Sequence, residues 1–335
     1  MRKKERKKKN VLLLLAFGLL FYAALIWSIN EIGRKLDPPV EGQNYGDLSE
    51  RFPLKHAVEY NDQIYEYREH ELVNILLLGI DSRNGTQTEE VRFGDQADFI
   101  LLLTVDKQNK RIIPIHIDRD TMTKVQIYGA FGDPAGTRVT QICLAQAFHS
   151  NAEEASQNTQ KAVSDLLAGI PIDYYVTMNL NGIAEFNDAI GGVTVTLEDD
   201  FSQIDQSMKK GETICLKGVQ AEIFVRNRTD VSDGTNAMRM RRQRIYMDAA
   251  MDILLQKMEK EKNFIGTLYD QLEPQLTTNM ERGFLINEAY KYSNYTYEDI
   301  ATLAGTHVIG SDGFVEFYPD QEALNLFVLD TFFKK

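Results

Sequence analysis

The sequence predicts a single α/β domain, preceded by one N-terminal transmembrane helix. Three apolar runs of strand length lie close together, at Leu72–Leu78, Phe99–Val105 and Ile112–Ile117. Continuous apolar runs of this length are typical of strands that are covered on both faces. Amphipathic helical patterns then alternate with further strands, and no internal repeat interrupts this order. One continuous plan of alternating strands and helices favours one domain.

Charge is unevenly distributed along the 335 residues. Residues 1–10 hold seven Lys or Arg and one Glu, a local charge of +6, whereas the whole chain carries −12 and residues 11–335 therefore carry −18. A body this acidic is not expected to bind nucleic acid. Any anion that it binds must meet a local concentration of basic residues.

The segment Val11–Ile29 contains 19 residues without a charge, which as a helix would span roughly 28 Å and cross a bilayer core. The alternative, a cleaved signal peptide, has an apolar region of about 7–15 residues that ends in a small-residue cleavage site. The bulky residues around Trp27 make a poor cleavage site. We therefore expect a single-pass anchor in the cell membrane. Residues 1–10 would form a basic cytoplasmic tail, residues 30–68 an extracytoplasmic stalk with some helix near its end, and residues 69–335 an extracellular domain.

Acidic and basic residues stand at the ends of the three apolar runs. Asp81 and Arg83 follow the first run, Asp98 stands at the start of the second, and Arg119 follows the third, with Asp120 as a turn residue or a partner that orients Arg119. We expect these side chains to gather at one rim of the sheet, where open α/β sheets bind ligands. Aspartates beside arginines suggest a divalent cation next to a phosphate.

The rest of the chain alternates between helical and extended patterns, and glycine and proline mark several boundaries. Helices are predicted at Thr137–His149, Ala152–Ala168, Gly182–Ala189, Arg239–Lys260 and Gln321–Phe333, and strands at Tyr174–Met178, Val193–Leu197, Ala221–Val225 and Val315–Tyr318.

Six arginines fall within one short basic segment: Arg226, Arg228, Arg239, Arg241, Arg242 and Arg244. Arginine suits phosphate because its planar fork donates two parallel hydrogen bonds and stays charged. Arg241 and Arg244 are expected on a solvated helix face. The predicted phosphate-binding set is Arg83, Arg119, Arg226, Arg228, Arg239 and Arg242. Asp81 and Asp98 would supply the carboxylates for Mg²⁺. Such positioning and charge neutralisation do most of the catalysis in phosphoryl transfer.

Other common site chemistries are not indicated. The five histidines show no zinc spacing, and the sequence contains no nucleophile elbow, phosphate-binding glycine loop or dinucleotide fingerprint. Cys143 and Cys215 have no metal-binding spacing. A disulfide between them is possible, but two buried free thiols are the expectation.

The order of these motifs resembles the LytR-CpsA-Psr family of cell-wall proteins, over about residues 70–335 and in the N-terminal anchor. The similar segments are Asn74–Arg83, Asp98, Arg119–Thr121, Leu167–Tyr175, Gly191–Val195, Leu216–Ala221, Val225–Arg228, Arg239 and Arg242–Gln243. Each motif alone is a weak signal, whereas their ordered combination is specific.

The resemblance implies a three-layer α/β/α domain with a mixed central sheet, outside a Gram-positive type membrane. It implies a phosphotransferase that moves an anionic glycopolymer, such as teichoic acid or capsule, from an undecaprenyl-pyrophosphate carrier to peptidoglycan through a phosphodiester bond. Mg²⁺ would lie between Asp81 and Asp98. The resemblance also adds Gln243 to the phosphate-binding residues, and Arg119, Asp81 and Asp120 are the expected catalytic residues. A hydrophobic tunnel would take the polyprenyl chain, lined by the helix near Arg239 and by apolar residues of 139–167.

The chain departs from the family pattern at two positions that matter for charge. Gln96 stands where the family usually has arginine, and Asp118 stands where it usually has proline. Both changes make the site less positive. Two alternatives therefore stay open: a pyrophosphatase in which water replaces the acceptor hydroxyl, and a non-catalytic, polyprenyl-phosphate-binding regulator of the cell envelope.

Overall fold

The computed structural model describes residues 57–82, 95–129, 132–149, 151–228, 231 and 233–335. The predicted anchor Val11–Ile29, most of the predicted stalk and Arg83 lie outside the described residues. Among the helices that are described, none is both long and apolar enough to cross a membrane. The described chain divides into a small unit, residues 57–67 with Lys334 and Lys335, and a large unit, residues 68–333.

The small unit contains an antiparallel hairpin of β1 (Ala57–Tyr60) and β2 (Gln63–Tyr67). Asn61 and Asp62 connect the strands with φ angles of 51° and 59°. Two successive residues of this kind in the left-handed region form the tight turn that two-residue hairpins prefer. The helix expected near the end of the stalk was therefore wrong in this part.

The large unit is built on a seven-stranded mixed sheet. Its order is β11 (Leu276–Thr278), β8 (Tyr174–Asn179), β3 (Leu72–Ile80), β4 (Ala97–Asp106), β5 (Arg111–Ile117) and β12 (Thr296–Tyr297), with β13 (Ala301–Thr302) also on β5. The three apolar runs of the sequence are β3, β4 and β5, which confirms their assignment as strands. Strands β3 and β4 are antiparallel, as are β4 and β5, whereas β3 and β8 are parallel. The end of β3, the start of β4 and the end of β5 therefore meet at one edge of the sheet.

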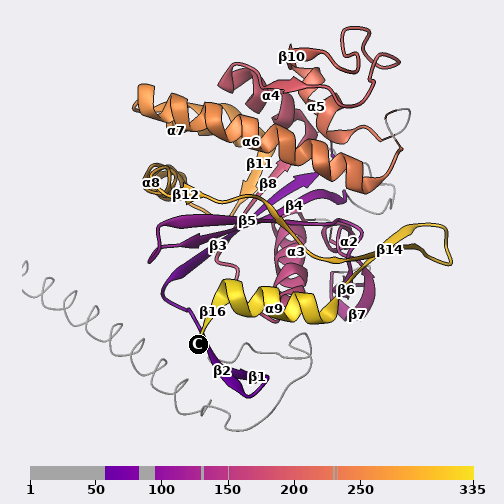
Figure 1. Cartoon of the computed structure of the whole chain (residues 1–335), viewed down its shortest axis with the longest axis vertical. Coiled ribbons are helices and arrows are strands. Elements are labelled where there is room, and N and C mark those ends of the chain that lie inside the picture. The colour runs from indigo at the N-terminus through magenta and orange to yellow at the C-terminus, as the bar shows by residue number, and fades with distance from the viewer. Residues whose placement is uncertain (1–56, 83–94, 130–131, 150, 229–230, 232) are drawn as a thin grey trace, which may run out of the picture. The chain divides into compact units, whose positions relative to one another are not determined.

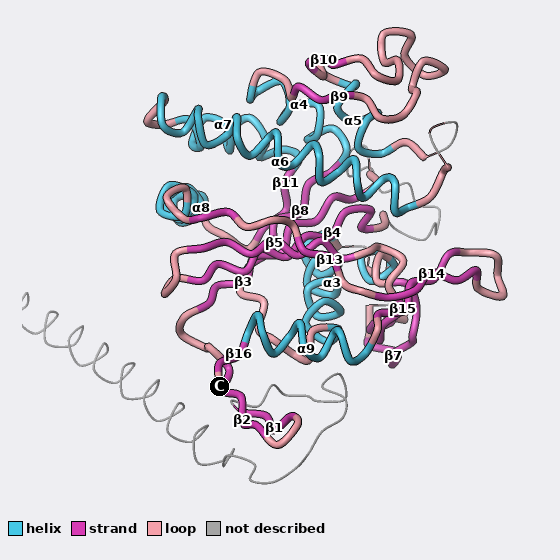
Figure 2. Tube along the Cα trace, viewed as in Figure 1, coloured by secondary structure: helices cyan, strands magenta, loops and turns pink. Residues whose placement is uncertain are grey.

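Helices cover both faces of the sheet (Figures 1 and 2). One layer holds α4 (Leu180–Ile190), α5 (Val219–Arg226), α6 (Asn236–Lys260), α7 (Phe264–Leu272) and α8 (Arg282–Tyr292), and the other holds α2 (Leu144–Ala147), α3 (Ala152–Leu166) and α9 (Gln321–Phe332). Three hairpins and a final strand complete the chain: β6 (Met122–Tyr128) with β7 (Pro134–Gln141), β9 (Thr194–Thr196) with β10 (Thr213–Cys215), β14 (Gly305–Ile309) with β15 (Val315–Pro319), and β16 (Phe333–Lys334). This arrangement confirms the predicted α/β class and the mixed central sheet.

Helix α6 illustrates how local sequence sets an element boundary. Its first residue is Asn236, and the side chain of Thr235 accepts a hydrogen bond from the Met238 N–H at 3.3 Å. A threonine cap satisfies one of the N–H groups that lack a partner at a helix start. The helix therefore begins three residues before the predicted Arg239, and this places Asn236 one turn before that arginine.

Two predicted elements were wrong. The segment Thr137–His149, expected as a helix, begins inside strand β7, and only Leu144–Ala147 within it is helical. Its first half contains Thr137, Val139 and Thr140, whose branched side chains favour strands, and it pairs with β6.

The segment Ala221–Val225, expected as a strand, lies in helix α5. Its buried residues include Ala221, Phe224 and Val225, and a spacing of three and four is the pattern of a helix with one face in the core. The predicted helix Ala152–Ala168 and strand Tyr174–Met178 are confirmed as α3 and β8.

A buried acidic group stabilises the edge of the sheet that lies opposite to the charged strand ends. Asp106 at the end of β4 is fully buried, and its Oδ2 accepts hydrogen bonds from Arg68 at 2.8 Å and Arg111 at 3.1 Å. Burial alone would raise the pKa of Asp106, but hydrogen bonds from Asn109, Arg68 and Arg111 bring it well below its usual range. The carboxylate therefore stays charged and stabilises the fold.

Candidate functional site

Arg119 lies just after the end of β5, and its guanidinium group contacts side chains from two other segments. It donates hydrogen bonds to Asp98 and Gln96, both near the start of β4, and its Nη2 lies 3.1 Å from the Cys143 sulfur. The side chain of Arg119 is only 11% exposed. Burial opposes its charge, but Cys143, Asp98 and Asp120 together raise the pKa of Arg119. The guanidinium group is thus held in one orientation and stays charged.

Arg239 reaches the same carboxylate from helix α6. Its Nη1 lies 3.1 Å from Asp98 Oδ2, and its Nη2 donates to Asn236 Oδ1 at 2.7 Å. Although Arg239 is almost wholly buried, its Nε has no hydrogen-bond partner among the described residues. Burial lowers the pKa of Arg239, and Asp98 partly opposes this effect. Asp98 therefore bridges two arginines that are 120 positions apart in the sequence.

A more exposed ion pair lies at the end of β3. Arg226, the last residue of α5, donates from Nη2 to Asp81 Oδ1 at 2.6 Å, and the two side chains are 37% and 40% exposed. The backbone N–H of Asp81 donates to the Gln96 carbonyl at 3.0 Å. This bond places Asp81 beside the start of β4, where Asp98 lies. We name Asp81, Asp98, Arg119, Arg226 and Arg239 the rim.

Two further carboxylates lie behind the rim. Asp120 Oδ1 is 3.4 Å from Arg119 Nε, and its Oδ2 is buried without a hydrogen-bond partner among the described residues. Burial, with a smaller effect of Asp118, raises the pKa of Asp120. Asp118 itself accepts hydrogen bonds from the Asp120 N–H at 2.9 Å and from Asn236 at 2.7 Å. It also lies 2.8 Å from the ring of His307. Asp118, the residue found where proline was expected, is therefore a polar anchor for this part of the fold.

Arg242 lies elsewhere, contrary to the expectation that it would join the other arginines. It is 3% exposed, pairs with Asp199 at 2.9 Å, and donates to the carbonyl groups of Phe224, at 3.0 Å, and Asn227. These contacts engage its guanidinium group in joining α6 to α5 and to the loop after β9. Arg242 is thus a packing residue in this structure.

The other predicted residues differ in exposure. Gln243 is buried beside the rim, and its Nε2 donates to the Val225 carbonyl at 3.2 Å. Arg228 is exposed, and its charge acts on Asp120 and Arg239. Arg241 is exposed and pairs with Glu198 at 2.9 Å, as expected for a solvated face. Arg244 is half-buried, so the solvated position expected for it was wrong.

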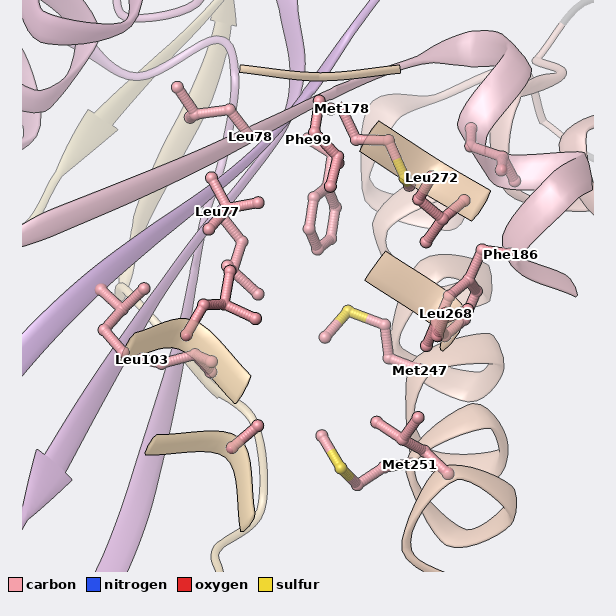
Figure 3. A pocket seen from close by; sticks show the side chains of 18 of the residues that line it. Leu77, Leu78, Phe99, Leu103, Met178, Phe186, Met247, Met251, Leu268 and Leu272 are labelled. Atoms are coloured by element: carbon pink, nitrogen blue, oxygen red, sulfur yellow. The ribbon is translucent and has the colours of Figure 1, made fainter. Parts of the chain in front are cut away.

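A large apolar cavity of about 520 Å³ opens at the rim (Figure 3). One wall consists mainly of side chains from β3, β4 and β8, and the other mainly of side chains from α4, α6, α7 and α8. The labelled side chains of Leu77, Phe99, Met247, Met251 and Leu268 point into the space from these two walls (Figure 3). Asp98, Arg226, Arg239 and Gln243 also line it. The cavity is therefore apolar along most of its lining, with three charged residues at the rim and Glu288 of α8 as a further charged lining residue.

The expected lining was correct for α6 and wrong for residues 139–167. None of the latter lines the cavity, because α2 and α3 lie on the opposite face of the sheet (Figure 1). Sequence reasoning also missed Asn236 and Cys143, which contact Arg239 and Arg119. For Asn236 a signal existed, because residues three positions apart on a helix lie side by side.

The rim carboxylates meet the chemical requirements of a hard divalent cation. Mg²⁺ is usually held by one or two carboxylates, together with phosphate oxygens and water, rather than by a complete protein cage. Asp81 and Asp98 would supply two carboxylates from neighbouring strands. No group of three or more His, Cys, Asp or Glu residues in the described part of the chain forms a fuller metal site, so a cation here would also need ligands from substrate and water.

Both cysteines are free thiols. Cys143 is buried and Cys215 is exposed, so only the first agrees with the expectation of two buried thiols. Burial raises the pKa of Cys143 to about 11, and Arg119 partly opposes this effect. Cys143 is therefore a neutral thiol that packs against Arg119.

The fold and the site define a class of protein: a three-layer α/β domain with an arginine–aspartate rim above an apolar cavity. The model of the LytR_cpsA_psr family matches residues 44–327. The chain belongs to this family.

Curated relatives and a solved structure agree with this assignment. The chain is 26% identical over 238 residues to a polyisoprenyl-teichoic acid–peptidoglycan teichoic acid transferase TagU of Halalkalibacterium halodurans, covering 71% of this chain and 66% of that protein. It is 27% identical over 292 residues to the protein of the same name from Oceanobacillus iheyensis, covering 87% of this chain and 82% of that protein. The crystal structure of protein gbs0355 from Streptococcus agalactiae superposes with a TM-score of 0.62 at 22% identity, over 80% of this chain and 91% of that one. At this identity the structural likeness supports the fold alone.

Proposed function

We propose that this protein is a membrane-anchored phosphotransferase. It would move an anionic glycopolymer of teichoic acid or capsule type from an undecaprenyl-pyrophosphate carrier to peptidoglycan. One observation carries the proposal: Asp98, Arg226 and Arg239 line the same cavity that apolar side chains line elsewhere. An amphiphile with an anionic head and a long apolar chain matches both parts. The names of the two TagU relatives support the same substrate class.

The polyprenyl chain would occupy the apolar cavity and leave the diphosphate at the rim. Burial of each methylene group in an apolar site contributes about 0.8 kcal/mol. Five methionines line the cavity: Met178, Met247, Met251, Met258 and Met280. Their flexible side chains adapt to an irregular apolar ligand.

The arginines would bind the diphosphate. Arg119, Arg226 and Arg239 already lie at the rim, and Arg228 is exposed nearby. Mg²⁺, when bound by Asp81 and Asp98, would supply positive charge beside the phosphate oxygens. Each guanidinium group presents several N–H donors, so it can bind a phosphate oxygen while keeping part of its present contacts.

In the proposed step, an acceptor hydroxyl oxygen forms a bond to the phosphorus that carries the glycan. The bond from this phosphorus to the bridging oxygen breaks, and polyprenyl phosphate leaves with that electron pair. Asp81 is the most exposed of the three carboxylates Asp81, Asp98 and Asp120, with side chains 40%, 17% and 6% exposed. Asp81 would therefore accept the hydroxyl proton, and Asp120 would act through Arg119.

The location follows from the same proposal. The segment Val11–Ile29 would anchor the chain with its N-terminus in the cytoplasm, so the rim would meet the carrier at the outer surface of the membrane. Membrane lipid is therefore a partner in this scheme, and nucleic acid is not.

The test uses the full chain with a polyprenyl-pyrophosphate-linked glycan, Mg²⁺ and peptidoglycan. The expected result is a glycan joined to peptidoglycan through phosphate. Arg119→Lys should lower turnover at least about tenfold, because lysine cannot reproduce the bidentate contacts, whereas Arg241→Lys on the solvated face should not. Equal turnover of Arg119→Lys and the unaltered chain would refute the site assignment.

Product analysis separates the alternatives. Release of a glycan phosphate with no dependence on peptidoglycan would identify a pyrophosphatase. Polyprenyl phosphate that copurifies with the chain, without turnover in any divalent metal, would identify a binding protein.

A further inference from the structure

A second, smaller pocket lies beside the rim and has no role in the proposed transfer. Its volume is about 170 Å³, and it is lined by residues of β5, α6, β13, β14 and β15. Helix α6 joins the two sites, because Arg239 lines the large cavity whereas Met240 and Arg244 line the small one.

Among the residues that the structure describes, the pocket contains a cation without an ion-pair partner. Arg244 is half-buried and lies within ion-pair distance of no carboxylate in the described part of the chain. Burial, with a smaller effect of Arg241, lowers the pKa of Arg244, while Asp248 on the next helix turn opposes this change. A guanidinium group nevertheless stays charged in proteins. Arg244 is therefore available to an anionic ligand.

One residue that lines the pocket also has a buried polar atom with no hydrogen-bond partner in the described part of the chain. His116 is 1% exposed, and its Nδ1 has no hydrogen-bond partner among the described residues. Burial, with the charges of Arg244 and Arg239, lowers the pKa of His116 to about 3. Its ring is therefore neutral at ordinary pH, and one of its nitrogens carries a hydrogen. A buried polar atom left unpaired is costly, and because His116 lines the pocket, a ligand there could form a hydrogen bond with its ring.

The other walls define the kind of ligand. Met240, Leu303 and Phe317 supply apolar surface. Asp118 also lines the pocket, but it is already engaged by the Asp120 N–H, by Asn236 and by His307. A carboxylate in the wall disfavours a doubly charged phosphate, whereas a single available arginine matches a single negative charge.

The position of the pocket connects it to the rim. Asp118 accepts from Asn236 at 2.7 Å, Asn236 accepts from Arg239 at 2.7 Å, and Arg239 lies 3.1 Å from Asp98. Three hydrogen-bonded side chains, Asp118, Asn236 and Arg239, therefore connect the wall of the pocket to the proposed phosphate site. The large cavity lies on another side of α6, so the polyprenyl chain does not compete for the pocket.

We propose that the pocket binds a small carboxylate-bearing substituent of the acceptor glycan, such as the lactyl group of a muramic acid residue whose carboxylate is not bonded to a peptide. Arg244 would bind the carboxylate, His116 would donate a hydrogen bond to it, and the apolar wall would contact the carbon atoms beside it. The assignment to an acceptor rests on the proposed function, and it makes Arg244 a residue that determines acceptor specificity.

The test compares two sugars that differ in one substituent. N-acetylmuramic acid carries a lactyl carboxylate, and N-acetylglucosamine lacks it. Binding of each sugar to the full chain is measured by ligand-observed nuclear magnetic resonance. The acid should bind at least about tenfold more tightly, the smallest gain expected from one charge-assisted hydrogen bond. Arg244→Met should remove the difference, and Arg244→Lys should retain part of it.

Control variants locate the effect. Arg241→Met removes a solvated arginine of the same helix and should keep the tenfold preference. Arg226→Met removes a rim cation and should also keep the preference, although it should lower transfer. Equal binding of the two sugars by the unaltered chain would overturn the proposal, as would a preference that survives Arg244→Met or disappears in Arg226→Met.

The binding measurement requires no turnover, so the two proposals can fail separately. A chain that transfers glycan but binds both sugars equally would refute the pocket alone. A chain that prefers the acid through Arg244 but transfers nothing would refute the transferase and leave the pocket in place.

Discussion

Asp98 forms the most buried ion pairs of the rim, because its carboxylate lies between two poorly exposed arginines. We consider the substitution Asp98→Asn, which keeps the shape of the side chain and removes its charge. Arg239 is 2% exposed and Arg119 is 11% exposed. Both guanidinium groups would lose a charged partner, and water can replace that partner only in part.

The magnitude follows from the two charged hydrogen bonds that Asp98 accepts from these arginines. Each hydrogen bond to a charged group contributes about 1.5–3 kcal/mol, and breaking a buried ion pair from one side costs about 3–5 kcal/mol. We expect Asp98→Asn to lower the free energy of unfolding by about 3 kcal/mol. This is a large fraction of the roughly 5–15 kcal/mol that stabilises a typical domain.

A double-mutant cycle isolates the pair. Asp98→Asn, Arg239→Met and the double variant are unfolded in urea, and near-ultraviolet circular dichroism follows the transition. The single tryptophan, Trp27, lies outside the described residues, so tryptophan fluorescence is not a suitable probe of the domain. The double variant should be less destabilised than the sum of the single variants, with a coupling energy of about 1.5–3 kcal/mol. A coupling energy below about 0.5 kcal/mol would show that the ion pair contributes nothing to stability.

Three further predictions follow from burial. The folded-state pKa of Asp106 is depressed, so its contribution to stability is present above the unfolded-state pKa of about 3.9 and is lost as pH falls through the lower folded-state value. The Asp106→Asn variant should therefore be less stable than the unaltered chain at pH 7 and should lose less stability on acidification. Parallel pH–stability curves for the two chains would contradict this prediction. Met247→Trp should fill part of the large cavity and weaken the binding of polyprenyl phosphate at least about tenfold, measured by the amount of lipid that copurifies. Met247→Leu, which conserves side-chain volume, should bind the lipid normally. Unchanged lipid binding in the tryptophan variant would exclude this cavity as the lipid site. A maleimide reagent at pH 8 should label the exposed Cys215 rapidly and the buried Cys143 only after unfolding. The Cys215→Ala variant should therefore stay unlabelled in its native state. Rapid labelling of the native variant would show that the thiol of Cys143, beside Arg119, is accessible.

The sequence was sufficient for the three central strands β3, β4 and β5 because they are long, apolar and bounded by charge, whereas the short strands β11, β12 and β13 of the same sheet were not predicted. Their burial on both faces leaves a continuous apolar signal, and the short length of the runs and the charges that flank them favour strands over buried helices. Short elements were less predictable. Segment Ala221–Val225 is rich in strand-forming residues, and its helical form depends on packing against α6, which local sequence does not encode.

Local sequence also limits which site residues could be predicted correctly. Asp81, Asp98 and Arg119 stand directly at strand ends, so the order of the strands is enough to bring them together. Arg239 and Arg242 lie side by side on one helix, and only the positions of α5 and Asp199 decide which of the two turns toward the rim. No local pattern could therefore separate these two arginines in advance.

The balance of charge at the rim explains why a cation belongs to the proposed mechanism. Arg119, Arg226 and Arg239 are each paired with Asp81 or Asp98, so a diphosphate must compete with carboxylates for the same N–H groups. A divalent cation on those carboxylates would weaken their hold on the arginines and would also attract the phosphate oxygens. The two ligands should therefore favour each other, and thermodynamic linkage makes that effect reciprocal. Gln96 strengthens the dependence, because an arginine at this position would supply a cation without any metal. The neutral Gln96 instead accepts a hydrogen bond from Arg119, so in the proposed mechanism a bound cation would add the positive charge that an arginine at this position would otherwise supply.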